Sequence, residues 1–323
     1  RIYNMAAVHS IGDFFVTVFY SVYDLLWGDL ITVPLPGGSL VGLSLLVLIL
    51  VPSGIYFTIR TRFLPFRLFP EMLRLVVEKK NVSQKAAICA LQALIVSTAT
   101  RVAMGNLVGV VAAISTGGAG AVFWMWLIAL LCSSTAFAEA VLAQLYKEKD
   151  PLYGGYRGGP AYYIHHFFAG KKKEKRRSVI AVLFALSGLI CWCGISQVIG
   201  NSVSSAFVNA FQIPPIYTTA VLVLIAAVIV LRTNATVKVQ DILVPVMAGC
   251  YFLATIFIII KNAGQLPAVF ERILMEAFGI RQAVAGGFGA VIMNGAKRGL
   301  FSNEAGSGSA PCAAAAADIS HPA

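Results

Sequence analysis

The chain has 323 residues, of which 58% are hydrophobic and only 12% are charged. Soluble domains carry about 25% charged residues, so this composition excludes an ordinary soluble protein. The formal charge of +11 does not indicate a nucleic-acid partner, because the basic residues cluster in loops between long apolar stretches. Several apolar stretches of 18 or more residues instead predict an all-α protein with many membrane spans.

Residues 4–27 are aromatic and apolar, with Asp13, Asp24 and Asp29 among or just beyond them. They predict either an amphipathic helix at the membrane surface, which we favour, or a weak span. A stretch rich in Pro and Gly at 34–38 then interrupts the chain.

Six apolar segments after this stretch predict membrane spans, and a seventh predicts an interrupted helix. The six spans cover residues 39–59, 86–115, 121–146, 178–209, 216–231 and 242–260. A basic loop with a short interfacial helix follows the first span, and a long loop occupies 147–177. Residues 262–281 are polar and mixed in charge, which predicts an outer loop with room for one short helix. The interrupted helix covers 283–317.

The distribution of basic residues predicts how these spans are oriented. The loops assigned to the inside carry 18 Lys and Arg residues, whereas the outer segments carry four. Cytoplasmic loops are enriched in Lys and Arg. We therefore expect a multi-pass protein of the cell (plasma) membrane, with its N-terminus outside and its basic loops in the cytoplasm.

Two of the apolar segments contain polar and glycine residues at membrane depth. Residues 101–109 of the second span read Arg-Val-Ala-Met-Gly-Asn-Leu-Val-Gly, with Thr98 and Thr100 just upstream. Residues 297–309 of the last segment read Lys-Arg-Gly-Leu-Phe-Ser-Asn-Glu-Ala-Gly-Ser-Gly-Ser. Such breaks are costly inside a membrane unless they line a cavity or a binding site.

Paired helix breaks are typical of secondary transporters. Half-helix N-termini present N–H groups to a carboxylate, whereas unwound carbonyls and half-helix C-termini suit a cation. The breaks lie five spans apart, as a five-plus-five inverted repeat predicts, and Asn106, Ser302 and Asn303 supply side-chain hydrogen bonds. The structural alternatives are a packing notch at Gly105 and Gly109 and a water-facing loop at the second break.

Four stretches of the sequence resemble the alanine or glycine:cation symporter family, also called sodium:alanine symporters. Gly105-Asn106-Leu107-Val108-Gly109-Val110 resembles the family's Gly-Thr-Gly-Asn-Ile-Ala-Gly-Val break. Residues 117–126 resemble the turn and helix start that follow it. Residues 158–164 resemble the inner-loop Gly-Gly-Pro-Met-Tyr-Tyr-Ile, and residues 297–311 resemble the second break, which usually has Gly-Leu-Gly.

The resemblance implies a LeuT-type inverted-repeat bundle that imports a small neutral amino acid, alanine or glycine, together with Na⁺ by alternating access. Residues 1–323 then form one transmembrane domain. Residues 39–59 are an extra N-terminal helix, 86–261 the first five-helix repeat, and 283–317 the first helix of the second repeat. The remaining helices of that repeat are missing, so we expect a truncated or partial sequence.

Together with the breaks, the resemblance predicts the residues of the site. The solute is expected beside Ala103, Met104, Gly105, Asn106, Phe301, Ser302, Asn303 and Gly306. The cation is expected beside Thr100, Gly105, Asn106, Ser302 and Asn303. Gating or pathway roles are expected for Arg101, Glu139, Lys297, Arg298 and Glu304.

The sequence departs from the family's pattern at the first break. Ala103-Met104 replaces Gly-Thr, which removes a hydroxyl and narrows the pocket, and Arg101 replaces a small or apolar residue. Arg101 is expected to pair with Glu139 or Glu304, to face a water-filled vestibule, or to extend towards solvent from a helix end.

The alternatives to Na⁺-coupled alanine or glycine transport are H⁺ coupling, another small amino acid as solute, a non-transporting truncated membrane protein and an intramembrane enzyme. The enzyme is disfavoured because the four histidines show no ligand spacing and the six cysteines lie in apolar segments without a Cys-x-x-Cys pair. We therefore expect no enzyme, no resident metal and no cofactor, with Na⁺, the amino acid and the lipid bilayer as partners.

Overall fold

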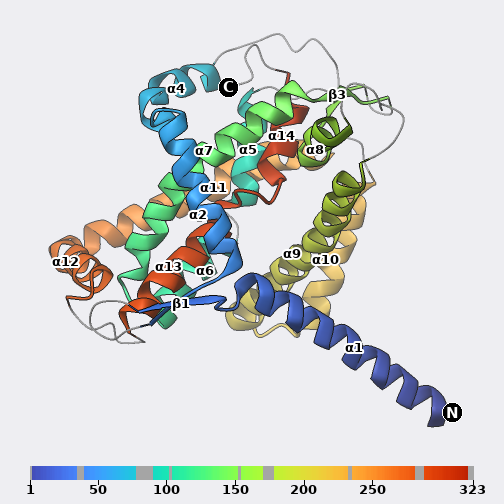
Figure 1. The fold of residues 1–323 in the computed structure, drawn as a ribbon, viewed down its shortest axis with the longest axis horizontal. Helices are drawn as coiled ribbons and strands as arrows, with labels where there is room; N and C mark the ends of the chain where they lie inside the picture. Colours follow the sequence, from blue (N-terminus) through green and yellow to red (C-terminus); the bar gives the residue numbers. More distant parts are fainter. Residues whose placement is uncertain are drawn as a thin grey trace. The chain divides into compact units, whose positions relative to one another are not determined.

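The computed structural model describes residues 2–34, 40–77, 90–101, 104–151, 154–169, 178–231, 235–280 and 287–318. Helices dominate these residues, as the sequence predicts (Figure 1). The chain divides into two compact units that interleave along the sequence, and each is described by itself. Unit 1 is Arg1–Arg62, Val108–Ser134 and Gly264–Asn303, and unit 2 is Phe63–Leu107, Thr135–Ala263 and Glu304–Ala323.

Unit 1 contains the N-terminal helix, a β-hairpin and the helices packed around the first half of α7. Its elements are α1 (Ile2–Trp27), β1 (Ile31–Pro34), β2 (Leu40–Leu43), α2 (Leu45–Arg60), most of α6 (Met104–Gly117), the first half of α7 (Ala121–Leu145), α12 (Leu266–Ala277) and α13 (Phe288–Asn303). A short 3-10 turn, Ala263–Gln265, precedes α12. Both α2 and β2 pack beside α13.

The hairpin was not predicted, and it corrects the start of the first span from residue 39 to Leu45. Strands β1 and β2 pair antiparallel, with Ile31 opposite Leu43 and Pro34 opposite Leu40. The helix begins later because Ser44 is its N-cap, and the Ser44 side chain accepts a hydrogen bond from the N–H of Val47 at 3.4 Å.

Helix α13 lies close along the first half of α7 because glycines face it. A Cβ on Gly295 would lie 2.5 Å from Cβ of Trp124, and one on Gly299 would lie 3.1 Å from Cβ of Ile128. Small residues at a spacing of four allow such close approach of two helices within a membrane. The two glycines therefore fix how α13 lies on α7.

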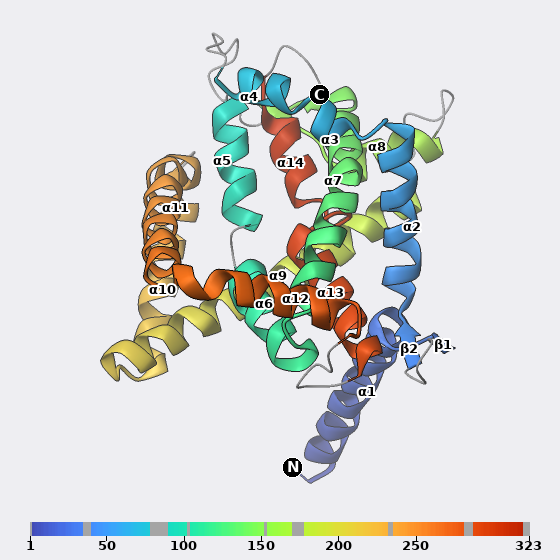
Figure 2. The same cartoon turned by 90° about the vertical axis from the view of Figure 1, so that its left-hand side faces the viewer.

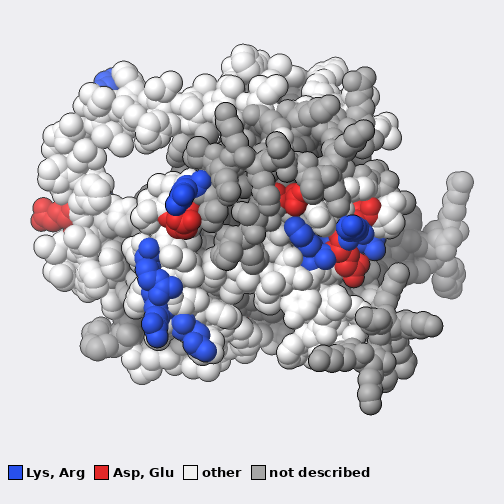
Figure 3. All heavy atoms as spheres, turned by 90° about the horizontal axis from the view of Figure 1, so that it is seen from above, with Lys and Arg blue, Asp and Glu red and all other residues white. Residues whose placement is uncertain are grey.

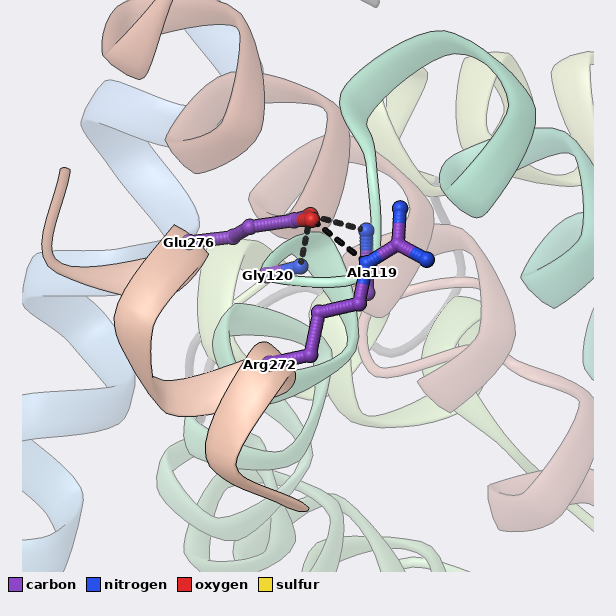
Figure 4. Close-up of polar contacts among 4 residues, drawn as sticks. All are labelled: Ala119, Gly120, Arg272 and Glu276. Carbon is purple, nitrogen blue, oxygen red and sulfur yellow. Dashed lines mark hydrogen bonds and ion pairs between the residues drawn. The ribbon is translucent and has the colours of Figure 1, made fainter. Parts of the chain in front are cut away.

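A buried acid joins α12 to the turn before α7 (Figure 4). The side chain of Glu276 is only 1% exposed. Its Oε2 accepts hydrogen bonds from the N–H groups of Ala119 at 2.7 Å and Gly120 at 3.3 Å, and its Oε1 accepts one from Nε of Arg272 at 2.7 Å. A Cβ on Gly120 would lie 2.5 Å from the backbone nitrogen of Ala277, so only glycine fits there.

These hydrogen bonds determine the charge state of Glu276. Burial by itself raises the pKa of this carboxyl. The bonds from Arg272 and from the backbone N–H groups of Gly120 and Ala119 outweigh burial and hold the pKa below its ordinary value. The carboxylate therefore stays charged at neutral pH, at the positive end of α7.

Unit 2 contains the remaining helices and a short hairpin. Its elements are α3 (Leu64–Arg67), α4 (Phe69–Val77), α5 (Ala90–Arg101), the second half of α7, β3 (Glu148–Lys149), β4 (Tyr156–Arg157), α8 (Pro160–Ala169), α9 (Val179–Phe211), α10 (Pro215–Val230), α11 (Ala235–Lys261) and α14 (Ser309–Ala316). Helices α9 and α10 lie side by side, α8 packs against α9, and α11 packs against α5. Figure 2 shows α14 between α5 and α7.

Among the described residues, three helices are long and apolar enough to cross a membrane: Ala121–Leu145, Val179–Phe211 and Ile242–Lys261. Their positions agree with three of the predicted spans. Helices α2 and α10 are apolar but shorter, and α8 lies within the predicted loop 147–177, where no helix was expected. On the face in Figure 3 the described charged side chains form small patches among uncharged residues.

We expect the substitution Glu276→Gln to destabilise the protein by about 2 kcal/mol at neutral pH, because it removes hydrogen bonds to a buried charged group. Thermal unfolding of the detergent-purified protein measures this loss. The matched control is Glu271→Gln, the same change at an exposed position of the same helix, which we expect to have almost no effect.

The same contact gives a pH dependence. Because the folded-state pKa of Glu276 is lowered, its contribution is full above the ordinary value of 4.5 and is lost as the pH falls through the folded-state pKa. The stability difference between wild type and Glu276→Gln should therefore shrink on acidification. A difference that stays constant down to pH 3 would contradict the assignment.

Candidate functional site

The last apolar segment is interrupted, as predicted, but over fewer residues than expected. Helix α13 ends at Asn303 and α14 begins at Ser309. The predicted break at 297–309 is wrong for 297–303, which are helical because α13 continues along α7 beyond Gly299. The backbone leaves the helix at Glu304, where φ is 56°, and Gly306 and Gly308 also have positive φ, at 87° and 91°.

In unit 1, the last turn of α13 carries three predicted site residues. Phe301 is 51% exposed, and Ser302 and Asn303 are half-buried. Nδ2 of Asn303 donates a hydrogen bond to the carbonyl of Ala129 at 3.1 Å. Its Oδ1 is buried and has no hydrogen-bond partner within the described parts of the chain. A buried unpartnered oxygen beside the last carbonyls of a helix is suited to bind a cation or an ammonium group.

In unit 2, two acidic residues form hydrogen bonds with the non-helical residues of the interruption and the start of α14. Oε1 of Glu139 accepts a hydrogen bond from the N–H of Gly306 at 2.8 Å. Oε2 of Glu304 accepts one from the hydroxyl of Ser309 at 2.5 Å, and the backbone oxygen of Glu304 accepts one from the hydroxyl of Ser307 at 2.8 Å. Carboxylates at the start of a helix match its orphan N–H groups and its positive dipole end.

The first predicted break lies at the edge of the described structure. Helix α5 ends at Arg101 and α6 begins at Met104, while Val102 and Ala103 lie outside the described residues. The side chains of Thr100, Arg101, Met104 and Gly105 also lie outside the description. The predicted pairing of Arg101 with Glu139 or Glu304 therefore stays a prediction.

Asn106 is half-buried in the first turn of α6. It belongs to unit 2, whereas Phe301, Ser302 and Asn303 belong to unit 1. That Asn106 and these three residues of α13 form one site stays a prediction.

Two further predicted residues lie in the C-terminal half of α13. Nζ of Lys297 donates hydrogen bonds to the backbone oxygen of Trp27 at 2.7 Å and to Oδ1 of Asp29 at 3.3 Å. This contact ties α13 to the end of α1 and gives Lys297 a structural role that the sequence did not indicate. Arg298 is exposed.

The Gly-Gly-Pro stretch at 158–160 packs against α14 within unit 2. A Cβ on Gly159, whose φ is +120°, would lie 2.6 Å from Sγ of Cys312. A Cβ on Gly308 would lie 3.0 Å from Cγ of Pro160. These residues therefore fit the stretch at 158–160 closely to α14, the second half of the interrupted helix.

Sequence reasoning missed Glu276, which was assigned only to a polar outer loop, and Gln144 and Lys147, whose partners lie on α14. The spacing of Arg272 and Glu276 by four residues was a weak signal, since such pairs adjoin on a helix. The partners of these residues lie more than 150 positions away in the sequence, and no local pattern marks them.

Comparison with known proteins places the chain in a family. The model of the "Sodium:alanine symporter family" matches residues 35–323. The amino-acid carrier protein AlsT of Bacillus subtilis is 44% identical over 85% of this chain and 57% of its own length. The probable sodium/glutamine symporter GlnT of the same organism is 42% identical over 86% of this chain and 57% of its own.

A third relative extends the match. The sodium/alanine symporter AgcS of Methanococcus maripaludis is 34% identical over 95% of this chain and 64% of its own length. The chain thus spans less than two thirds of each of these relatives. All three relatives are named as carriers or symporters, and the family is the one that the sequence motifs predict. The chain belongs to the sodium:alanine symporter family.

Proposed function

We propose that the protein imports a small neutral amino acid, alanine or glycine, together with Na⁺ by alternating access. Its family and the names of its relatives support this function. The observation that carries the proposal is the buried, unpartnered Oδ1 of Asn303 at the end of α13. A group of this kind is costly unless a ligand satisfies it.

The chemistry of the helix ends suggests which part of the solute and which ion each end receives. The last carbonyls of α13, with Oδ1 of Asn303, offer oxygen ligands to Na⁺ or to the amino group of the solute. The start of α14 already receives the carboxylates of Glu139 and Glu304. We therefore assign the solute carboxylate to the first N–H groups of α6, at Met104, Gly105 and Asn106.

The test of the function is uptake of labelled alanine into proteoliposomes under an inward Na⁺ gradient, with glycine and glutamine measured in parallel. We expect Na⁺-dependent accumulation of alanine or glycine. Uptake that is unchanged in Na⁺-free, proton-clamped medium would contradict Na⁺ coupling. If the protein shows no uptake of alanine and no equilibrium binding of alanine, the result would favour a membrane protein that does not transport.

A second prediction tests the role of Asn303. Asn303→Ala removes the free oxygen, so the Na⁺ concentration for half-maximal uptake should rise on the order of ten-fold, as expected for one lost ligand bond. The control is Asn262→Ala, which removes an exposed amide whose Nδ2 donates a hydrogen bond to the carbonyl of Ile258 in the same helix turn. An unchanged Na⁺ dependence in Asn303→Ala would exclude Asn303 as a ligand.

A further inference from the structure

The C-terminal end of α14 is bound by Gln144, in the last turn of α7, and by Lys147, which lies two residues beyond the end of α7. Nζ of Lys147 donates hydrogen bonds to the backbone oxygen of Ala317 at 2.7 Å and to Oε1 of Gln144 at 2.8 Å. Nε2 of Gln144 donates to the backbone oxygens of Ala314 and, at 3.1 Å, Ala317. These are carbonyls at the end of α14, where helices leave carbonyls without an internal partner.

The charges of Glu139 on α7 and of Lys147 just beyond it match the two ends of α14. Lys147 lies at the C-terminal, negative end of α14, and Glu139 accepts the N–H of Gly306 just before its N-terminal, positive end. A helix of only eight residues is not stable by itself, so α14 depends on these contacts.

Close packing leaves α14 little freedom to shift at this end. Ala143 of α7 and Ala315 of α14 are fully buried. Gly158 lies against both, since a Cβ there would be 2.8 Å from Cβ of Ala315 and 3.3 Å from the backbone oxygen of Ala143. Nζ of Lys147 also lies 4.1 Å from the ring centre of Tyr156, a cation–π contact that holds the ammonium group over α14's end.

We propose that Lys147 and Gln144 are positioning residues of the transport cycle. They hold α14 against α7 and thereby fix the geometry of the interruption at 304–308, without contact to the solute or the ion. The transport part of this proposal rests on the proposed function, whereas the attachment of α14 to α7 does not.

The attachment is measured through Cys312 of α14, whose Sγ packs closely against Gly159. In a variant that keeps Cys312 as its sole cysteine, a polar maleimide reports how readily this helix leaves its place. Lys147→Met should raise the labelling rate on the order of ten-fold, because bonds from a charged donor are lost. Lys147→Arg, which retains charge and donors, should stay near the wild-type rate.

The matched control is Lys149→Met, which removes the same charge from an exposed position two residues away. It should label like the parent protein. If Cys312 is labelled in both Lys147→Met and Gln144→Leu at the rate seen in Lys149→Met, the proposed attachment of α14 by Lys147 and Gln144 is wrong. This readout needs no transport, so it stands or fails independently of the proposed function.

The transport assay distinguishes positioning from a purely structural role. A displaced interruption should raise the alanine concentration for half-maximal uptake in Lys147→Met, and Lys147→Arg should reverse much of that rise. A role in stability alone would lower the maximal rate through loss of folded protein and leave half-saturation unchanged. That second result would overturn the positioning role.

Discussion

The structure depends on hydrogen bonds to the free N–H and C=O groups at the ends of its helices. A bilayer provides no water to bond the free N–H and C=O groups of a helix end, so each end needs a protein partner. Here the partners are charged side chains of the matching sign. Glu276 accepts hydrogen bonds from N–H groups in the turn before α7, and Glu139 accepts one from the N–H of Gly306. Lys147 donates one to the carbonyl of Ala317. These side chains provide partners for backbone groups at the interruption, at the end of α14 and at the start of α7.

Helix α7 supplies partners to both parts of the interrupted segment. In unit 1, its first half offers a close surface to Gly295 and Gly299 and a carbonyl to Asn303. In unit 2, Glu139 of its second half accepts a hydrogen bond from the N–H of Gly306, and Lys147, just beyond the end of α7, donates one to the carbonyl of Ala317. The glycine-rich stretches that resemble the family thus have a packing reason. Under the proposed function, the end of α13 and the start of α6 keep free the groups that bind the ion and the solute.

The long apolar helices were predictable, because α7 and α9 combine length with apolar composition. The interruption was predictable from its glycines, but its start was misplaced, since the packing of Gly299 on α7 keeps residues up to Asn303 helical. The hairpin at 31–43 was missed because an apolar stretch beginning near 39 reads as helix. Asn303 was named as a ligand from its residue type, yet only the structure shows that its Oδ1 lacks a partner. Glu276, Gln144 and Lys147 depend on distant partners that no local pattern reveals.

The central claim is that side-chain charges hold the interruption in one geometry. Native-state hydrogen exchange at the backbone amide of Gly306 tests it most directly, because exchange requires the bond to Glu139 to open. The account predicts slow exchange in the wild-type protein and clearly faster exchange in Glu139→Leu, while amides in the middle of α7 stay protected in both. Exchange at Gly306 that is as fast in the wild type as in Glu139→Leu would contradict it.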